Sequence, residues 1–214
     1  MKIAIIGAGS VGLALGQRFA ELGHQIVFGL RPHTSDDVKS TVQRMGHGVV
    51  INVVSAAIQT SEVVVLAVPY AAALQVASQE SSLDGKVVID VTLPLKADYS
   101  GLSIGHETSA GERLQAAASN AHIVKAFNIT GFENMVNPEI GGQRLMMPIA
   151  GDDQAAKAVV LKLASQLGFD AVDAGPLKQA RLTEPLGMLW IALAGSAGLG
   201  RDMGFSLLRR GSTS

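Results

Sequence analysis

The sequence predicts an α/β fold with a doubly wound parallel sheet and a small C-terminal α/β extension. Short runs rich in valine and isoleucine alternate with helix-like segments along the first 128 residues, the order that builds a parallel sheet with helices on its faces. The runs are nearly continuous in apolar residues, as in strands that helices cover on both sides. A glycine-rich turn directly follows the first run and opens the first helical segment.

Six strands are expected in this region, at residues 2–6, 25–29, 49–53, 63–68, 86–91 and 122–127. Helices are expected between them at residues 10–22, 35–45, 70–81 and 110–119, and Gly23 ends the first. Farther along, a strand-like run at 145–149 precedes a helix near 152–167, a short strand at 170–173 and an uncharged helical stretch. We therefore expect one domain at residues 1–128 and a small cap or dimerisation region at residues 129–214.

Composition excludes several classes of protein. The net charge is −1 and there is no basic block, which argues against a nucleic-acid partner. The chain has no cysteine, so disulfides, thiolate zinc sites, iron–sulfur clusters and cysteine nucleophiles are excluded. Its five histidines are scattered without the spacing of a metal pair, so no metal site is expected. What remains is a small enzyme or a small binding domain.

We expect no membrane segment and predict a cytoplasmic location. The apolar start of the chain could be mistaken for a signal peptide, but its ordered glycines fit a buried strand that runs into a turn. The longest uncharged run is residues 185–200, which contain four glycines. That run is shorter than the roughly 20 apolar residues that span a bilayer.

The glycine-rich turn has the pattern G-x-G-x-x-G at residues 7–12. In dinucleotide-binding turns the first glycine, Gly7, permits a tight bend, and the second, Gly9, lets the backbone approach a pyrophosphate. The third, Gly12, lets helix and strand pack closely. Ser10 and Val11 open the helix, whose free N–H groups and positive dipole end favour phosphate. We expect a Rossmann-type dinucleotide-binding domain.

The end of the second strand indicates which dinucleotide binds. An acidic residue at this place would hold the ribose hydroxyls of NAD. The sequence here is Phe-Gly-Leu-Arg-Pro, without a carboxylate, and Arg31 offers a planar, permanently charged group suited to a phosphate. Arg31, with its neighbours Leu30 and Pro32, is therefore expected to bind NADPH in preference to NADH.

The carboxyl ends of the later strands should line the cofactor crevice. After the fourth strand these residues are Ala67, Val68, Pro69 and Tyr70, and after the fifth strand the crevice residue is Thr92. Asp90 is expected to cap the turn that it opens. Lys125, at the end of the sixth strand, is the one good candidate for an acid–base group. The scarcity of acid–base side chains at the crevice favours hydride exchange between a nicotinamide and a flavin-like ring. That reaction needs stacking of the two rings more than side-chain chemistry.

Several motifs together resemble the NADP-dependent coenzyme F420 oxidoreductase family. They are the glycine turn, FGLRP at 28–32, LAVPYAAAL at 66–74, IVKAFN at 123–128, AGDD at 150–153 and DAGPL at 173–177. The resemblance covers nearly the whole chain. It implies a Rossmann domain with a small C-terminal extension, a homodimer, and hydride transfer between NADP(H) and a deazaflavin (coenzyme F420) or a flavin (FMN or FAD).

The resemblance also implies roles for single residues. It places the pyrophosphate on residues 9–12, the 2′-phosphate on Arg31, and the nicotinamide against Val68 and Pro69. Asn128 aligns with the loop that faces the deazaflavin ring, so Asn128 and Lys125 would orient the acceptor or stabilise its developing negative charge. The archaeal deazaflavin enzymes differ in having a longer glycine loop, and a histidine where this chain has Asn128.

Two other functions remain open. The first is a small hydroxyacid or imine reductase that uses Lys125 as its acid, although such enzymes carry a larger helical second domain. The second is a non-catalytic NADPH-binding sensor whose uncharged C-terminal helix docks a partner.

Apolar side chains of residues 186–199, interspersed with glycine and alanine, predict that the C-terminal helix forms a homodimer interface. The low charged content of 16%, against roughly 25% in average soluble proteins, agrees with a covered surface. Arg201, Arg209 and Arg210 are expected to form a solvated basic tip.

Overall fold

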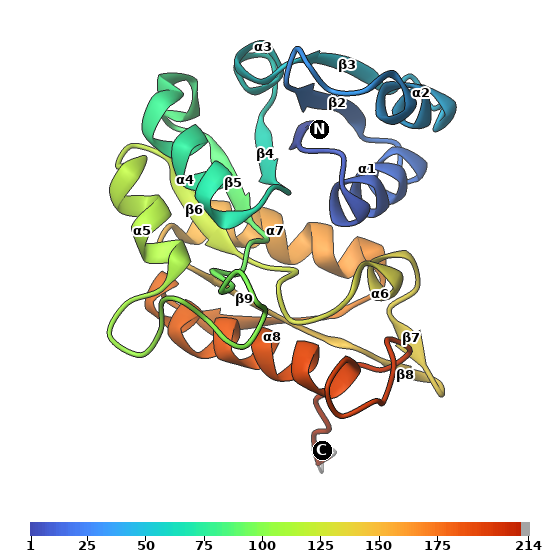
Figure 1. Cartoon of the computed structure of the whole chain (residues 1–214), viewed down its shortest axis with the longest axis vertical. Helices are drawn as coiled ribbons and strands as arrows, with labels where there is room; N and C mark the ends of the chain where they lie inside the picture. Colours follow the sequence, from blue (N-terminus) through green and yellow to red (C-terminus); the bar gives the residue numbers. More distant parts are fainter. Residues whose placement is uncertain (211–214) are drawn as a thin grey trace.

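The computed structural model describes residues 1–210 and contains an eight-stranded sheet of order β10-β9-β6-β5-β4-β1-β2-β3 (Figure 1). Its strands are β1 (Lys2–Ile6), β2 (Gln25–Leu30), β3 (Val50–Val53), β4 (Val63–Leu66), β5 (Val87–Asp90), β6 (His122–Lys125), β9 (Met146–Gly151) and β10 (Asp170–Gly175). Neighbouring strands pair in parallel, except that β6 and β9 are antiparallel. The order β3-β2-β1-β4-β5-β6 confirms the predicted Rossmann topology and places its switch point between β1 and β4.

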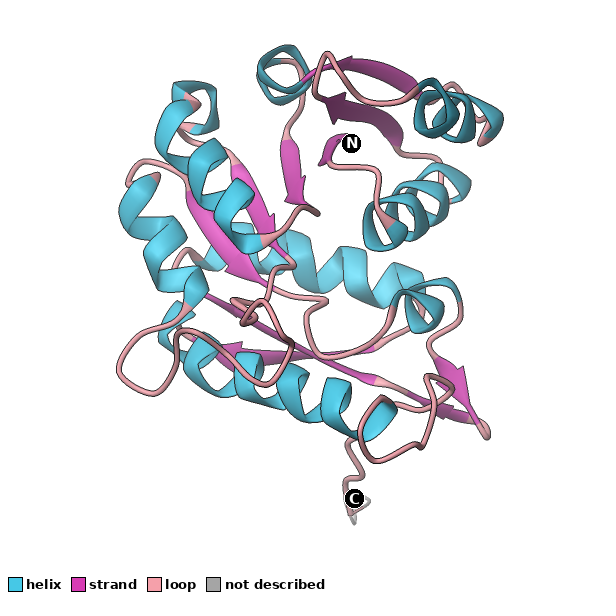
Figure 2. Ribbon diagram, in the orientation of Figure 1, coloured by secondary structure: helices cyan, strands magenta, loops and turns pink. Residues whose placement is uncertain are grey.

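Helices cover both faces of this sheet (Figure 2). They are α1 (Ser10–Glu21), α2 (Asp36–Arg44), α3 (Val54–Gln59), α4 (Tyr70–Gln79), α5 (Ala110–Ala117), α6 (Phe132–Val136), α7 (Gln154–Leu167) and α8 (Ala180–Ala194). Short 3₁₀ turns occur at Ser81–Leu83 and Leu177–Gln179, and a small hairpin joins β7 (Glu139–Ile140) to β8 (Gln143–Arg144).

The alternation of side chains along β1 shows why its sequence is apolar throughout. Ile3 and Ile5 belong to the core beneath α1 and α7, whereas Ala4 and Ile6 belong to the core beneath α3, α4 and α5. All four side chains are at most 2% exposed. A strand with a helical layer on each face has no solvent-facing position, so the usual alternation of apolar and polar residues disappears.

The C-terminal part continues the same sheet. The predicted strands at 145–149 and 170–173 and the helix near 152–167 are present as β9, β10 and α7. Because β9 pairs directly with β6, the sheet crosses the predicted boundary at residue 128 without interruption. The division into domains 1–128 and 129–214 stays a prediction.

The structure corrects several element boundaries. The strand predicted to reach Phe127 ends at Lys125, and the helices α3 and α6 and the β7–β8 hairpin were not expected. Helix α3 follows β3 with no residue between them, and its N-cap residue Val53 makes no side-chain cap. It therefore lacks the start signal that would identify a helix in the sequence. No helix of the described residues is long and apolar enough to cross a membrane.

Candidate active site

A cleft of about 650 Å³ lies at the carboxyl ends of β1, β4, β5 and β6, at the switch point of the sheet. The residues that line it come from four loops: Gly9, Ser10 and Val11; Ala67, Val68, Pro69, Tyr70 and Ala71; Val91, Thr92, Leu93, Leu95, Lys96, Ala97, Tyr99 and Ser103; and Phe127, Asn128 and Thr130. Open α/β sheets bind their ligands at this position. Nine of the residues proposed from the sequence are therefore brought together here.

The glycine turn after β1 has the geometry that a pyrophosphate requires. Gly7 has a φ of 103°, in the left-handed region that favours glycine, and a Cβ there would overlap the carbonyl oxygen of Ala67. A Cβ on Gly12 would overlap the carbonyl oxygen of Gly7, so this glycine lets α1 pack closely on the turn. By contrast, a Cβ on Gly9 would meet no atom within 4 Å. That open face, and the lack of a side-chain cap on α1, leave its first N–H groups available to a phosphate.

The end of β2 supplies a cation at the same edge of the sheet. Leu30 is buried, while Arg31 and Pro32 are exposed beyond it. Arg31 forms no ion pair with any residue in the described part of the chain, and the first carboxylates after it are those of Asp36 and Asp37 in α2. These residues fit the 2′-phosphate of NADP(H), which needs an unpaired cation where NAD enzymes place an acid.

The loop after β6 contains a strained residue, Phe127, directly before Asn128, which lines the cleft. Phe127 has a φ of 60°, a conformation that a bulky residue rarely adopts and that is often found at functional sites. Its N–H donates to Sδ of Met147 at 3.0 Å, and its ring packs edge-on against Phe169. The next residue, Asn128, is 4% exposed and donates through Nδ2 to the carbonyl oxygen of Thr183 at 2.9 Å.

Three buried oxygen atoms of cleft-lining residues have no hydrogen-bond partner within the described part of the chain. They are Oδ1 of Asn128, Oγ1 of Thr92 and the hydroxyl oxygen of Tyr70, and the first two belong to residues that are themselves buried. Buried polar atoms are rarely left unpaired. An acceptor oxygen and a hydroxyl together suit a carboxamide, which presents both a donor and an acceptor. The residues present therefore fit the nicotinamide end of the cofactor as well as its phosphates.

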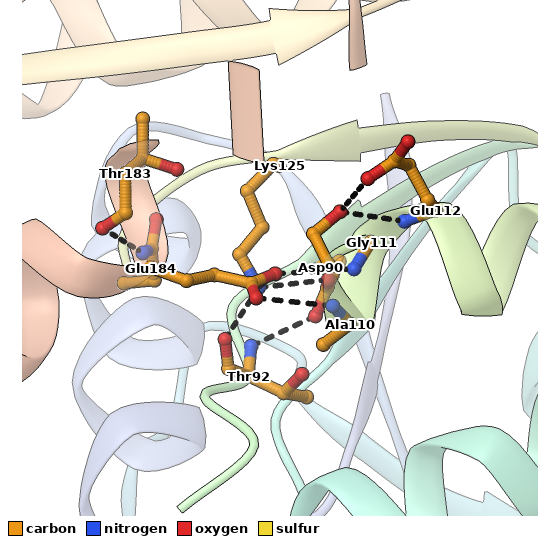
Figure 3. A network of polar contacts seen from close by, with 10 residues as sticks. Asp90, Thr92, Ala110, Gly111, Glu112, Lys125, Thr183 and Glu184 are labelled. Carbon is orange, nitrogen blue, oxygen red and sulfur yellow. Dashed lines mark hydrogen bonds and ion pairs between the residues drawn. The ribbon is translucent and has the colours of Figure 1, made fainter. Parts of the chain in front are cut away.

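Lys125 does not line the cleft, contrary to the direct contact expected from the sequence. Its side chain is fully buried, and Nζ lies 2.9 Å from Oδ2 of Asp90 and 3.0 Å from Oε1 of Glu184 (Figure 3). Nζ also donates to the carbonyl oxygen of Thr92. Its amino group is therefore held behind the cleft, between two carboxylates. Asp90 caps its turn as expected, by accepting from the N–H of Thr92 at 2.8 Å.

Tyr70 is the half-buried phenol at the start of α4 that lines the cleft. Burial raises the pKa of its hydroxyl, and the nearby Arg113 opposes this shift only in part. The phenol therefore stays protonated at neutral pH and is available as a hydrogen-bond donor.

Sequence reasoning missed Glu184 and the loop that follows Thr92. Glu184 is a single acid at the start of an apolar stretch, so no spacing marked it. The loop from Leu93 to Ser103 is held by a bridge between Leu95 and Leu102 and by bonds from the N–H and hydroxyl of Ser103 to the carbonyl oxygen of Pro94. No group of residues that could hold a metal ion occurs in residues 1–210.

Comparison with known proteins agrees with this geometry. Residues 2–94 match the family described as coenzyme F420-dependent NADP oxidoreductase. The F420-dependent NADP reductase of Methanothermobacter thermautotrophicus is 31% identical over 209 residues, which cover 90% of this chain and 89% of that protein. The crystal structure of an Arthrobacter sp. FB24 protein assigned as an F420-dependent NADP reductase superposes with a TM-score of 0.87 at 30% identity, over 98% of this chain and 100% of that one.

A third relative is much longer. Metalloreductase STEAP3 of Rattus norvegicus is 28% identical over 186 residues, which cover 86% of this chain but only 36% of that protein. The relatives of similar length match nearly the whole of this chain, and their match together with the cleft identifies the family. This chain is an NADP-dependent oxidoreductase and belongs to the coenzyme F420-dependent NADP oxidoreductase family.

Proposed function

We propose that the protein transfers hydride between NADP(H) and a deazaflavin, with coenzyme F420 as the first candidate and a flavin as the second. The observation that carries this proposal is the chemistry of the cleft wall. None of the described residues that line the cleft is a carboxylate or a histidine, and the charges of Lys125 and Asp90 neutralise each other behind the wall. Hydride exchange between two stacked rings needs no side-chain acid, whereas carbonyl or imine reduction would depend on a weak acid of the cleft such as the Tyr70 hydroxyl.

The cofactor-binding roles follow from position. We propose that Gly9, Ser10 and Val11 bind the pyrophosphate through their N–H groups, with Gly7 and Gly12 shaping the turn. Leu30, Arg31 and Pro32 would hold the adenosine 2′-phosphate end. Ala67, Val68, Pro69 and Tyr70 would form the wall against the ribose and the nicotinamide.

Asn128 and Thr92 orient the reacting ring in this proposal. Their unpaired oxygens would bind the nicotinamide carboxamide, and this would fix which face of the ring points to the acceptor. Bound NADPH supplies the hydride. The wall residues contribute by holding the two rings within about 3–3.5 Å of each other and by excluding water between them.

The acceptor would enter from the side of the loop after Thr92. Leu95, Lys96 and Tyr99 line that side of the cleft, and Tyr99 is 65% exposed. An exposed aromatic ring can stack on a planar acceptor. The neighbouring lysine can attract an anionic group that the acceptor carries.

A second candidate is reduction of a small imine or carbonyl compound. The Tyr70 hydroxyl supports it, because this phenol lines the cleft, is protonated at neutral pH and could donate a proton, although burial raises its pKa and so weakens it as an acid. Replacement of Tyr70 by Phe would then abolish turnover of such a compound, and would leave deazaflavin reduction largely intact if the first proposal holds.

We also propose that the protein is a homodimer that associates through α8 and the residues after it. Leu182, Leu189 and Leu199 are 67%, 49% and 63% exposed, an unusual amount of leucine surface for one short region. Gel filtration with light scattering should give twice the mass of one chain. A monomer at all concentrations would rule this interface out.

The decisive experiment measures NADPH oxidation by the purified protein with coenzyme F420, FMN and FAD in parallel. Turnover with F420 well above that with FMN or FAD is the expected result. Turnover with a flavin alone would change the acceptor class. Tight NADPH binding without turnover of any of the three would favour the imine reductase or a sensor.

A further inference from the structure

We infer that Glu184 is a positioning residue for hydride transfer, which acts from α8 through Lys125 on the two strand ends that carry Thr92 and Asn128. The inference rests on the proposed function in one respect, namely that the nicotinamide lies against these two residues. Glu184 itself does not line the cleft and touches no reacting atom in this arrangement. Its effect would be to fix the positions of Thr92 and Asn128 beside the nicotinamide.

The network around Glu184 is buried, and both of its carboxylates are hydrogen-bonded. Asp90, Lys125 and Glu184 are each at most 1% exposed, and three oxygen atoms surround the Lys125 amino group (Figure 3). Oε2 of Glu184 accepts from the N–H of Ala110 at 3.0 Å, and Oε1 accepts from that of Gly111 at 3.1 Å. The second carboxylate is thus balanced by the first N–H groups of α5, where the helix dipole favours negative charge.

The network joins elements that are far apart in the sequence. Asp90 ends β5, Lys125 ends β6, and Glu184 lies in the first turns of α8. Because the Lys125 amino group at the end of β6 is surrounded by oxygens from the end of β5, from the loop after β5 and from α8, removal of one partner would let the others shift. Removal of one partner from a buried ion network leaves an uncompensated charge, so the groups that remain must move to find new partners.

Three hydrogen bonds carry this geometry to the cleft. Both backbone polar groups of Thr92 belong to the network, since its N–H donates to Asp90 and its carbonyl oxygen accepts from Lys125. Its position in the wall is therefore fixed while its hydroxyl remains unpaired. The amide of Asn128 donates to the carbonyl oxygen of Thr183, the residue directly before Glu184. One turn of α8 thus contacts Asn128 directly, through Thr183, and Thr92 indirectly, through Glu184 and Lys125.

This arrangement predicts a specific kinetic signature. Loss of the Glu184 charge should displace the nicotinamide wall and leave the phosphate sites at Gly9 and Arg31 in place, because these belong to β1 and β2. A displacement near 1 Å at a reacting centre costs roughly 10- to 100-fold in rate. A role in general stability alone would lower the amount of folded enzyme without changing the rate of each folded molecule.

The test compares Glu184→Gln with the wild type in three measurements. Turnover with the best acceptor is expected to fall roughly 10- to 100-fold. The affinity for adenosine 2′,5′-bisphosphate, which lacks the nicotinamide, is expected to stay within about 2-fold. This ligand would bind at the phosphate sites of β1 and β2, which Glu184 does not contact. The emission of bound NADPH, which reports on the nicotinamide surroundings, is expected to change.

Arg181→Met is the matched control. Arg181 lies one turn before Glu184 in α8 and pairs with Glu112 of α5 at 2.7 Å, but it does not contact Lys125 or line the cleft. Its replacement also weakens the link between α8 and α5, so it should lower the melting temperature without changing turnover. If Glu184→Gln does not fold, Glu184→Asp keeps the charge but shortens the side chain by one methylene, and it should also lower turnover and change the emission of bound NADPH.

The outcomes separate this inference from the proposed acceptor. Unchanged NADPH emission and unchanged turnover in a folded Glu184 variant would overturn the inference. If the wild type reduces neither deazaflavin nor flavin, the acceptor proposal fails, yet a changed NADPH emission in Glu184→Gln with retained bisphosphate affinity would still support the positioning role.

Discussion

Gly187 of α8 packs directly on the backbone carbonyl oxygen of Asn128, so closely that a Cβ at residue 187 would overlap that oxygen. The same Cβ would meet both methyl groups of Leu93, at 3.1 and 3.2 Å. Leu93 and Asn128 line the cleft after β5 and β6. The contact shows that α8 fits against the site with its backbone as well as through Glu184.

Replacement of Gly187 by Ala should therefore displace the wall. In an ordinary helix interior the change would stabilise by about 1 kcal/mol. Here the overlap should outweigh that gain, with a net loss of about 1–3 kcal/mol in the free energy of unfolding. Urea denaturation and steady-state kinetics would test this, and turnover should fall more than NADPH affinity.

Gly101→Ala provides the control for this prediction. Its Cβ would meet no atom within 4 Å, and its backbone is not left-handed, so stability and turnover should hardly change. A Gly187→Ala variant as stable and active as the wild type would show that α8 can move away from Asn128 without consequence.

The sheet could be predicted from the sequence because its strands are buried on both faces. Runs such as Val63–Leu66 contain only apolar residues, and their spacing by helices leaves the Rossmann order as the natural topology. The phosphate-binding turn was predictable for a related reason. Its glycines serve backbone geometry that is local in the chain, so the pattern and the structure coincide at Gly7, Gly9 and Gly12.

The surroundings of Lys125 could not be predicted in this way. Its partners Asp90 and Glu184 lie 35 and 59 residues away in the sequence, and neither belongs to a motif of fixed spacing. At the end of a strand, an ammonium group that faces the cleft and one that is buried behind it have the same local sequence. Only the packing of α8 against β5 and β6 decides between them.

Arg31→Ala should weaken NADPH binding far more than NADH binding. A charge-assisted hydrogen bond contributes about 1.5–3 kcal/mol, which corresponds to roughly a 10- to 100-fold loss of NADPH affinity. Fluorescence titration with each nucleotide would measure the ratio. Arg44→Ala, which removes an exposed arginine of α2 without a carboxylate partner, is the control for loss of charge. Equal losses for NADPH and NADH would remove Arg31 from the 2′-phosphate site.

Asn128→Ala should reduce turnover roughly 10-fold or more while NADPH affinity changes little, because orientation of the ring counts more in the transition state than in binding. Asn134→Ala is the matched control. Asn134 is 2% exposed and also donates from Nδ2, to the carbonyl oxygen of Met203 and to Oγ1 of Thr130; it lies outside the cleft and reaches it only through Thr130. An Asn128 variant with normal turnover would contradict the assignment.

The C-terminal segment should make stability depend on acid pH through Glu133. Arg201, expected from the sequence at a solvated tip, instead pairs with Glu133 of α6 and lies over the rings of Phe132 and Trp190. Arg209 likewise pairs with Asp170. The hydrogen bond from Arg201 holds the pKa of Glu133 below its usual value of 4.5, against the opposing effect of burial.

A carboxyl whose pKa is lower in the folded state stabilises the fold above the unfolded pKa, and this contribution is lost as the pH falls through the folded pKa. Arg201→Met keeps an apolar side chain over Phe132 and Trp190 but removes the cation. It should lower the free energy of unfolding at pH 7 by about 1 kcal/mol or less, since the pair is partly exposed. It should also flatten the decline in stability below about pH 4.5, where Glu133 titrates. Denaturation series at several pH values would measure this, and a decline as steep as that of the wild type would show that other carboxyls, such as Glu112 beside Arg181, dominate the acid response.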